Sequence, residues 1–335
     1  MLCFAIPSKP GYLSDSLKVL NGPRGSLAQL FYRGKHIQER LKVYGFDRFY
    51  NSTCLICHIY KDIEKNTVEM LPLRYARLVN VSREVDTFSF DFKLEAFTSV
   101  NSKQFRNILV NECHQPHIFQ PPVNLVFETK DIFQFHYSYS LHSWEETLDQ
   151  LAKIVSENKE TAAYSDLVLS AQLYVLGVTN INQKCSSYDP SVFYWSERLE
   201  NRKHYNLVCY AYYPLVSDGI DDIVGGNSSN TTTVTTDNNI GNSHDAGKEE
   251  ENDDDYELEP TTFYMNSSQN IEILIGYPSE IVVEKKRDLI QIPFMTNVTS
   301  DEFRWQHGFI CAHKRIDDSV IDTCLRFEIE NNKCC

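Results

Sequence analysis

The five residues from Cys54 to His58, Cys-Leu-Ile-Cys-His, have side chains and a spacing suited to two kinds of metal chemistry. The pattern matches the attachment sequence of a c-type haem, and its two thiols could equally supply half of a zinc site. Cys113 with His114 or His117 would complete such a zinc site. However, residues three apart in an extended strand face opposite sides, and the segment has no Gly for a turn. We therefore predict buried thiols here, with no metal site and no cofactor.

Two pairs of residues have the types needed for a nucleophile and its base, Cys113 with His114 and Cys311 with His313. Neither pair lies in a known catalytic motif, because the chain has no Gly-x-Ser-x-Gly, no His-Glu-x-x-His and no local cysteine-protease signature. Its 13 glycines form no phosphate-binding loop. The adjacent carboxylates Asp221–Asp222 and Asp317–Asp318 lie in loop-like sequence and are expected to be solvated. The sequence thus favours a protein without catalytic residues.

Aromatic residues are numerous, with 19 Tyr and 19 Phe in a chain of 335 residues. One interpretation is the packing of sheet faces. The other is a recognition surface, since aromatic side chains anchor interfaces with little loss of entropy. The candidates for such a surface are Phe193, Tyr194, Trp195, Tyr210, Tyr212 and Tyr213.

The ten cysteines fit an intracellular protein in which thiols serve as small apolar side chains. The initial MLCFAI is short for a signal peptide, and no apolar run approaches the length of about 18 residues that a membrane helix needs. We therefore expect a cytoplasmic protein without a transmembrane segment. The Asn-x-Ser/Thr sequons are then a product of composition; they begin at Asn51, Asn80, Asn227, Asn230, Asn266 and Asn297.

The last two residues, Cys334 and Cys335, are similar to the double-cysteine tail that is prenylated in Rab-type GTPases. The phosphate-binding loop of that family is absent, so the resemblance is confined to these two residues. One interpretation, implied by the resemblance, is lipidation of these cysteines. The other is that the match arises by chance.

A low-complexity stretch from 217 to 260 interrupts the chain, and we predict that it is disordered because it has few residues to bury. It holds 13 acidic side chains and one basic one, which leaves 33 acidic and 31 basic residues elsewhere. This balance argues against a general DNA-binding surface. Residues 1–50 nevertheless carry eight basic side chains against three acidic ones. Such a basic face could meet phosphates, dock the acidic insertion or simply be solvated.

Apolar residues mostly three and four apart predict a helix from Ser26 to Tyr44, with Gly45 as its stop. The clearest signal is the strict alternation from Asp86 to Phe97. It places Phe90 and Phe92 on one face of a strand, with the other face in water.

A second helix is predicted to begin at Ser143, with Glu146 as its capping partner and an apolar face that starts at Trp144. Beyond Asp166 the chain reads as short strands separated by turn signals, including a strand from Leu167 to Thr179, which is typical of a sandwich.

We thus expect a mainly β protein with antiparallel, sandwich-like sheets and two helices in its N-terminal half. Residues 1–160 would form one β-rich domain, and 161–330 a sandwich-like domain that carries the insertion. The predicted function is non-enzymatic recognition or scaffolding of a protein partner through β-sheet and aromatic surfaces. The alternative is a cysteine-dependent or metal-dependent hydrolase whose site is assembled from distant residues.

Overall fold

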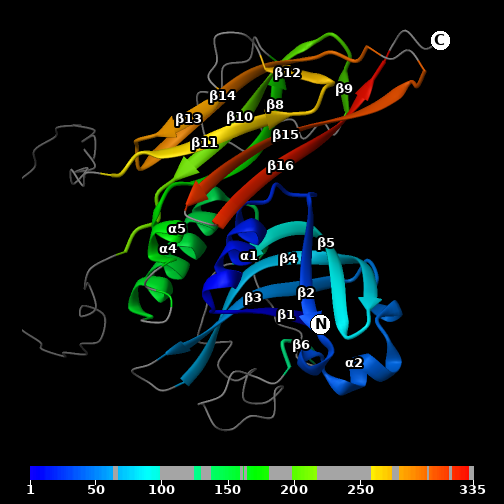
Figure 1. Ribbon diagram of the computed structural model, residues 1–335, viewed down its shortest axis with the longest axis vertical. Coiled ribbons are helices and arrows are strands. Elements are labelled where there is room, and N and C mark those ends of the chain that lie inside the picture. Colours follow the sequence, from blue (N-terminus) through cyan, green and yellow to red (C-terminus); the bar gives the residue numbers. More distant parts are fainter. Residues whose placement is uncertain are drawn as a thin grey trace, which may run out of the picture. The chain divides into compact units, whose positions relative to one another are not determined.

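The computed structural model describes residues 1–62, 67–98, 124–129, 137–158, 161, 164–180, 198–216, 258–273, 279–299, 302–316 and 319–331. Met1–Val216 and Glu259–Cys335 form one compact unit, from which Ser217–Leu258 is set apart. The predicted insertion at 217–260 falls almost entirely outside the described residues. The compact unit is mainly β and holds all the described helices and strands (Figure 1).

The N-terminal part of the unit is built on a seven-stranded sheet in the order β2-β5-β4-β3-β1-β6, with β7 paired to β5. All its pairs are antiparallel except that of β1 with β3. The strands are β1 (Leu2–Pro7), β2 (Leu27–Arg33), β3 (Thr53–Asp62), β4 (Thr67–Glu84), β5 (Thr87–Thr98), β6 (Val126–Glu128) and β7 (Tyr137–Ser138).

This sheet curls until its two ends meet. Ile37, four residues after β2, forms a bridge with Val126 of β6, the strand at the opposite end of the sheet. Phe4 of β1 contacts Phe90 and Phe92 of β5, with ring centroids 5.0 and 4.6 Å apart. All three rings are fully buried. The alternation predicted for β5 is therefore confirmed, and its phenylalanines form the core of the curled sheet.

The helix predicted from Ser26 to Tyr44 is wrong. The segment forms strand β2, a 3₁₀ helix over Gly34–His36 and the short helix α2 (Glu39–Tyr44). Leu30 and Tyr32 are buried while Phe31 between them is 60% exposed, so the segment has the period of a strand. Pairing with β5 overrides the helical spacing of the apolar residues, as tertiary context often does. Gly45 does end a helix, since it caps α2 with a φ of 73°.

Helix α1 (Pro10–Asn21) was not among the elements predicted from the sequence. It is held by Arg74 of β4, a fully buried side chain that donates to the carbonyls of Val19 and Leu20 at 3.0 and 3.3 Å. These carbonyls lie in the last turn, where no further helical N–H can reach them. The buried face of the helix consists of Leu13, Leu17 and Leu20.

The second predicted helix is confirmed as α4 (Leu141–Glu157), although it begins earlier than expected. Ser140 is the N-cap, and its hydroxyl accepts a hydrogen bond from the N–H of Ser143 at 3.3 Å. The apolar face matches the prediction, because Trp144, Leu148, Leu151, Ala152 and Val155 are all fully buried. The next segment, predicted as one strand from Leu167, instead forms helix α5 (Ser165–Leu169) followed by strand β8.

The C-terminal part is a sandwich of two sheets, ordered β12-β14-β10-β8 and β13-β11-β15-β16-β9. Stacked rings of Phe294 and Phe327, 5.8 Å apart, join the two sheets across the core. The sandwich-like architecture is thus confirmed. Its strands are β8 (Gln172–Asn180), β9 (Arg198–Glu200), β10 (His204–Tyr212), β11 (Thr261–Ser267), β12 (Ile271–Ile273), β13 (Glu280–Val283), β14 (Arg287–Thr296), β15 (Trp305–Ile316) and β16 (Ser319–Glu330).

Helix α4 connects the two parts of the unit. Glu145 on α4 pairs with Arg287 of β14 at 3.1 Å and accepts the hydroxyl of Tyr210 of β10. One hydrophobic core includes residues from both the N-terminal sheet and the sandwich. The boundary expected between residues 160 and 161 remains a prediction. None of the helices in the described residues has the length and apolarity to cross a membrane.

Candidate functional site

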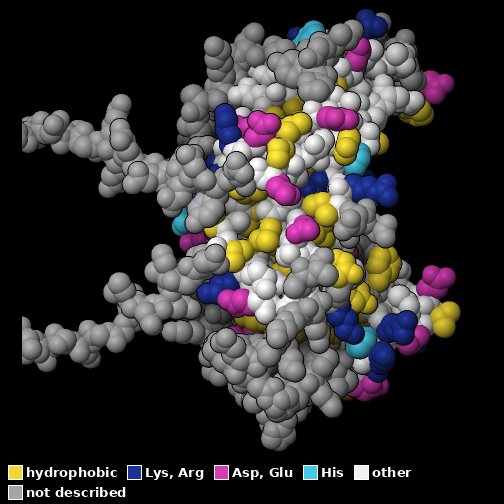
Figure 2. Space-filling view, turned by 60° about the vertical axis from the view of Figure 1, so that its left-hand side comes forward, with side chains coloured by type: hydrophobic (Ala, Val, Ile, Leu, Met, Phe, Trp, Pro, Cys, Tyr) yellow, Lys and Arg dark blue, Asp and Glu magenta, His cyan; other side chains and the backbone are white. Residues whose placement is uncertain are grey.

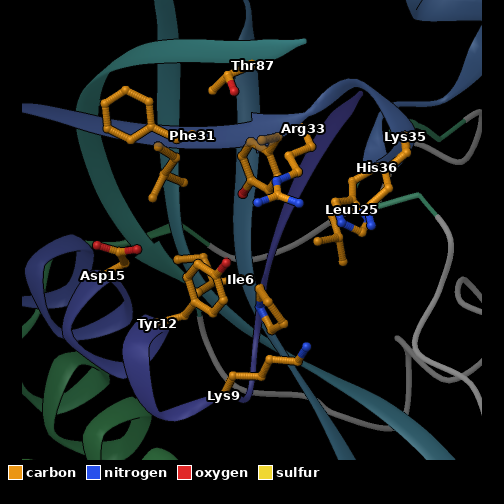
Figure 3. A pocket seen from close by; sticks show the side chains of 13 residues that line it. Ile6, Lys9, Tyr12, Asp15, Phe31, Arg33, Lys35, His36, Thr87 and Leu125 are labelled. Carbon is orange, nitrogen blue, oxygen red and sulfur yellow. The ribbon is translucent and has the colours of Figure 1, made fainter.

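A pocket of about 660 Å³ opens between α1 and β2 (Figure 3). This volume lies in the range of sites that hold small molecules or the anchor residues of a peptide. Its lining is aromatic and aliphatic with a few charged groups. The lining residues are Ile6, Pro7, Lys9, Tyr12, Asp15, Leu30, Phe31, Tyr32, Arg33, Lys35, His36, Thr87 and Leu125.

The pocket runs along the edge of strand β2. Four successive residues, Leu30 to Arg33, line it. Successive side chains of a strand point to opposite faces, so a cavity that meets four in a row must follow the edge. In the strand order β2 is terminal, and among the described strands it pairs with β5 alone. The pocket thus borders a strand edge that no described strand covers.

The hydrogen bonds to β5 show which backbone groups face this edge. Gly34 donates its N–H to the carbonyl of Asp86 at 2.7 Å, and Ser26 accepts from the N–H of Leu94 at 2.9 Å. In an antiparallel pair the bonded positions alternate, so the even-numbered residues of β2 point toward β5. The N–H and C=O groups of Phe31 and Arg33 therefore point toward the pocket.

The charged groups are separated along the pocket. Asp15 lies at one end beside Tyr12, whereas Lys35 and His36 lie at the other end with Arg33 between (Figure 3). The side chains of Arg33 and Lys35 are exposed, so they can meet a ligand from solvent. Figure 2 shows Lys or Arg side chains gathered around a His at the lower right, beside hydrophobic side chains. The pocket is accordingly electropositive at one end and carries a carboxylate at the other.

One of the lining residues, Tyr32, carries a polar group without a partner among the described residues. Tyr32 is only 6% exposed, and its hydroxyl forms no hydrogen bond within the part of the chain that the structure describes. Burial raises the pKa of Tyr32, and Cys57 and Asp15 add to this rise, so the hydroxyl stays protonated. Burial likewise raises the pKa of Asp15, against the opposing charge of Lys18. A buried hydroxyl without a partner is costly.

The Cys-Leu-Ile-Cys-His segment lies in the interior on β3 and does not reach the pocket. Cys54 donates its thiol to the carbonyl of Ala76 at 3.2 Å, and Cys57 donates to that of Phe4 at 3.4 Å. Both cysteines and His58 are fully buried or nearly so. Burial also raises the pKa of the Cys54 thiol, so it is a poor metal ligand. The buried thiols predicted here are confirmed.

Other candidate residues from the sequence lie outside the described ranges, so their arrangement stays a prediction. They are Cys113, His114, His117, Phe193, Tyr194, Trp195, Asp221, Asp222, Asp317, Asp318, Cys334 and Cys335. Within the described ranges, no three His, Cys, Asp or Glu side chains are grouped to hold a metal ion.

Three tyrosines in and just after β10 are buried and do not form a recognition surface. Tyr210, Tyr212 and Tyr213 are at most 3% exposed. Tyr212 donates to Asp149 of α4, and Tyr213 donates to the carbonyl of Glu259 at 2.7 Å. Their role is the packing of sheet faces, the other interpretation that the sequence left open.

Cys311 cannot act as a nucleophile with His313, because it forms a disulfide with Cys324. The expectation that every cysteine is a thiol is therefore wrong for this pair. The two residues stand opposite each other in the β15–β16 pair, a register that the sequence alone did not specify.

The pocket itself was missed by the sequence interpretation. Its basic residues belong to the excess noted in residues 1–50, but the helix expected from Ser26 would have spread Arg33 and Lys35 around a cylinder. The sequence held no clear signal for it, because the apolar run of Leu30, Phe31 and Tyr32 fits a strand as well as a helix.

No protein-family model and no curated protein matches the chain. Among solved structures it has a likeness to the native conformation of E. coli alpha-2-macroglobulin, with 10% identity and a TM-score of 0.22 over 42% of this chain and 6% of that one. A structure of native Escherichia coli alpha-2-macroglobulin from domain MG7 to the C-terminus gives 9% identity and a TM-score of 0.23, over 49% of this chain and 17% of that one. The chain thus spans a small fraction of either protein, and likeness at this level supports no conclusion about function.

Proposed function

We propose that the chain is a non-enzymatic recognition protein that binds an extended, acidic segment of a partner protein along the edge of β2 that no described strand covers. The observation that carries this proposal is the position of the pocket, which lies beside four successive residues of an edge strand. An extended segment that pairs with such an edge gains main-chain hydrogen bonds, and adjoining pockets select its side chains.

The backbone of Phe31 and Arg33 offers the groups for this pairing. An uncovered edge is a hazard for a protein, because any extended chain can pair with it. The exposed ring of Phe31 would cover the apolar side of a bound segment. Aromatic side chains of this kind are frequent anchors at protein interfaces.

The charges specify what kind of segment fits. Lys9, Arg33 and Lys35 line the pocket with exposed side chains, and Asp15 is the single carboxylate among the lining residues. Acidic side chains on the partner would match these cations and be steered toward them. No described residue favours the alternative of a cysteine-dependent or metal-dependent hydrolase.

The test is a selection from a random peptide library displayed with free N-termini, using the full chain as bait. We expect enrichment of peptides rich in Asp and Glu, which bind at least tenfold more weakly to Arg33→Glu. Arg40→Glu is the matched control, because Arg40 is an exposed cation of α2 outside the pocket. The affinity of the Arg40→Glu chain for the same peptides should stay within about twofold of that of the native chain.

A second measurement tests the main-chain pairing. Methylation of alternate backbone nitrogens in a selected peptide removes the N–H donors on one edge, and it should abolish binding in one register but not in the other. Enrichment of peptides without acidic residues, or equal binding to native and Arg33→Glu chains, would overturn the proposal.

A further inference from the structure

We propose that the electropositive end of the pocket receives a phosphotyrosine side chain of the bound partner segment. This inference rests on the proposed function and makes it more specific, because it names the side chain that the pocket selects. The cations that would hold the phosphate come from three segments. Lys9 directly precedes α1, Arg33 ends β2, and Lys35 lies in the 3₁₀ helix that follows β2.

These three cations have no carboxylate partners. Lys9, Arg33 and Lys35 are exposed, and none of them forms an ion pair with another residue that the structure describes. Cations elsewhere in the N-terminal part are paired, for example Arg48 with Glu128 and Arg77 with Glu95. Unpaired cations that line one pocket repel one another, and a bound anion replaces that repulsion with attraction.

Figure 3 shows how the side chains lie around the pocket. Arg33 reaches in from the β2 side, and Lys35 lies beside His36 at the end away from Asp15. Lys9 lies on the side opposite Arg33, and its chain extends away from Asp15. An anion in this end of the pocket would therefore meet cations on both sides.

Such an arrangement suits a phosphate better than a carboxylate. A phosphate monoester carries a charge of about −1.5 to −2 near pH 7 and has three strong acceptor oxygens. A carboxylate carries a single charge on two oxygens, and one guanidinium can satisfy it with two parallel hydrogen bonds. Three cations on different walls exceed what one carboxylate requires, and they match the charge and the oxygens of a phosphate.

Helix α1 adds positive potential at the same wall. Its N-cap, Lys9, forms no side-chain cap, and its first turn contains no acidic residue. The pocket is lined on this side by Pro7, Lys9 and Tyr12, which flank the start of the helix. Because the N-terminal end of a helix carries a partial positive charge, this wall favours an anion in addition to the charge of Lys9 itself.

The rest of the lining suits an aromatic ring. Ile6, Leu30 and Leu125 contribute aliphatic surface, and the ring of Tyr12 is 44% exposed. Aromatic rings pack well with their centres about 4.5 to 7 Å apart, which an exposed ring on the wall permits. A tyrosine ring also carries its phosphate farther from the main chain than serine does. A segment paired with β2 could thus place its phosphate among cations on the surrounding walls.

The experiment starts from an acidic peptide selected on the full chain. Each acidic residue of this parent peptide is replaced in turn by phosphotyrosine, and affinity is measured by fluorescence anisotropy with a dye at the C-terminus. We expect phosphotyrosine at one position to tighten binding about tenfold or more relative to the parent peptide. At that position, unmodified tyrosine and phosphoserine should each bind at least about fivefold more weakly than phosphotyrosine.

Variants of the pocket cations localise the phosphate. Lys9→Gln and Lys35→Gln should each reduce the preference for the phosphotyrosine peptide over the parent peptide to about threefold or less. This preference is a ratio within each variant, so a uniform loss of affinity for acidic peptides leaves it unchanged. Arg40→Gln, at an exposed cation of α2 outside the pocket, is the matched control and should keep the native preference within about twofold.

A further variant tests the ring contact. Tyr12→Ala should weaken the phosphotyrosine peptide severalfold and leave the phosphoserine peptide unchanged within about twofold, because only the former has a ring to pack. Tyr12 is exposed, so the truncation should not unfold the chain, and thermal melts check this for every variant.

The outcomes separate the two proposals. If no acidic peptide is selected on the native chain, the proposed function is overturned and this inference with it. If acidic peptides bind but phosphotyrosine tightens none of them, or if phosphoserine serves equally well, the phosphotyrosine site alone is overturned. The same follows if the preference survives both Lys9→Gln and Lys35→Gln. A preference that either lysine variant removes and Arg40→Gln retains supports the site.

Discussion

The hydroxyl of Ser16 on α1 lies 3.0 Å from Nδ1 of His58 on β3, and both side chains are fully buried. Nε2 of the same imidazole has no partner among the described residues. Burial lowers the pKa of His58 from its ordinary value of 6.5 to about 4. The native protein therefore holds a neutral histidine beneath α1, close to the segment that carries Asp15.

This histidine predicts a loss of stability in mild acid. Between pH 6.5 and about pH 4 the unfolded chain binds a proton that the folded chain does not, so the folded state becomes less stable as pH falls. At 1.36 kcal/mol per pH unit, the roughly two units between pH 6.5 and pH 4.5 give a loss of about 2.5 kcal/mol. It would be measured as the difference in unfolding free energy between urea melts at pH 7 and pH 4.5.

His58→Gln provides the comparison, because glutamine does not titrate. The variant should be less stable than the native chain at pH 7, but its loss of stability between pH 7 and pH 4.5 should be smaller by about 2.5 kcal/mol. His204→Gln, at an exposed position, controls for the removal of a histidine as such. Equal pH dependence in the native and His58→Gln chains would show that His58 is not the titrating group.

The rings of β5 predict that substitutions on the two faces of this strand differ greatly in how much stability they cost. Phe90→Ala or Phe92→Ala removes a fully buried ring and should cost about 3 to 5 kcal/mol. Asp91 lies between them on the outer face, where it accepts hydrogen bonds from Gln29 and Asn80 in an exposed setting. Asp91→Ala should therefore cost less than about 1 kcal/mol. Denaturant melts that ranked Asp91→Ala as the more damaging change would contradict this assignment of faces.

Strand β5 also shows why part of the fold could be predicted. Alternation from Phe88 to Leu94 is strict, and it can be satisfied only by a strand with one buried face. The apolar face of α4 is equally regular, which fixed its existence although not its first residue. In the segment from Ser26 to Tyr44 the apolar residues fit both periods, and the pairing with β5 decided the outcome. That pairing is non-local and cannot be seen in the segment itself.

The pocket could not be predicted for the same reason. One side, Tyr12 with Asp15, comes from α1, a segment for which no element was predicted. The other side, Phe31 with Arg33, comes from β2, which was predicted as part of a helix. The unpartnered hydroxyl of Tyr32 is a property of the folded chain, because it depends on what surrounds the ring. By contrast, the strand at Cys54 could be predicted without a metal-binding turn, because that prediction depends only on local backbone geometry.

The hydroxyl of Tyr212 donates to both carboxylate oxygens of Asp149, each at 2.9 Å, and so ties β10 to α4. Tyr212→Phe leaves the half-buried carboxylate with one fewer donor, and we expect a loss of about 1 to 3 kcal/mol. Tyr264→Phe, at a tyrosine that is 40% exposed, is the matched control and should change stability by less than about 0.5 kcal/mol. Thermal melts at pH 7 measure the stability of both variants. Equal stability of the two would show that the contact between Tyr212 and Asp149 does not stabilise the packing of β10 against α4.

Deletion of Gly219 to Glu257 should leave the compact unit folded. The two sides of this segment meet in the structure, because Tyr213 donates its hydroxyl to the carbonyl of Glu259 at 2.7 Å and its oxygen lies 3.0 Å from the hydroxyl of Thr261. A short Gly/Ser turn can therefore join them. We expect cooperative unfolding with a melting temperature within ten degrees of the native value, a limit that corresponds to roughly 3 kcal/mol. A non-cooperative transition would mean that the deleted residues contribute to the core.

The disulfide between Cys311 and Cys324 predicts a stability that depends on the redox state. The bond closes a loop with a sequence separation of 13 residues, which in the chain-entropy model corresponds to about 3 kcal/mol. The double variant Cys311→Ser/Cys324→Ser should lose about 2 to 3 kcal/mol relative to the oxidised native chain. Urea melts without a reducing agent measure this loss directly.

Reduction separates the effect of the bond from that of the substitutions. In excess reducing agent, the native chain should fall toward the stability of the double variant, while the double variant itself should not change. Cys209→Ala is the control, because Cys209 is a buried thiol outside the disulfide and its variant should respond to reduction as the native chain does. Intact mass under non-reducing conditions should show the native chain lighter by two hydrogen atoms than after full reduction. A native chain whose melting did not respond to complete reduction would show that pairing of β15 with β16 suffices to hold this hairpin, and the disulfide would then contribute nothing measurable to its stability.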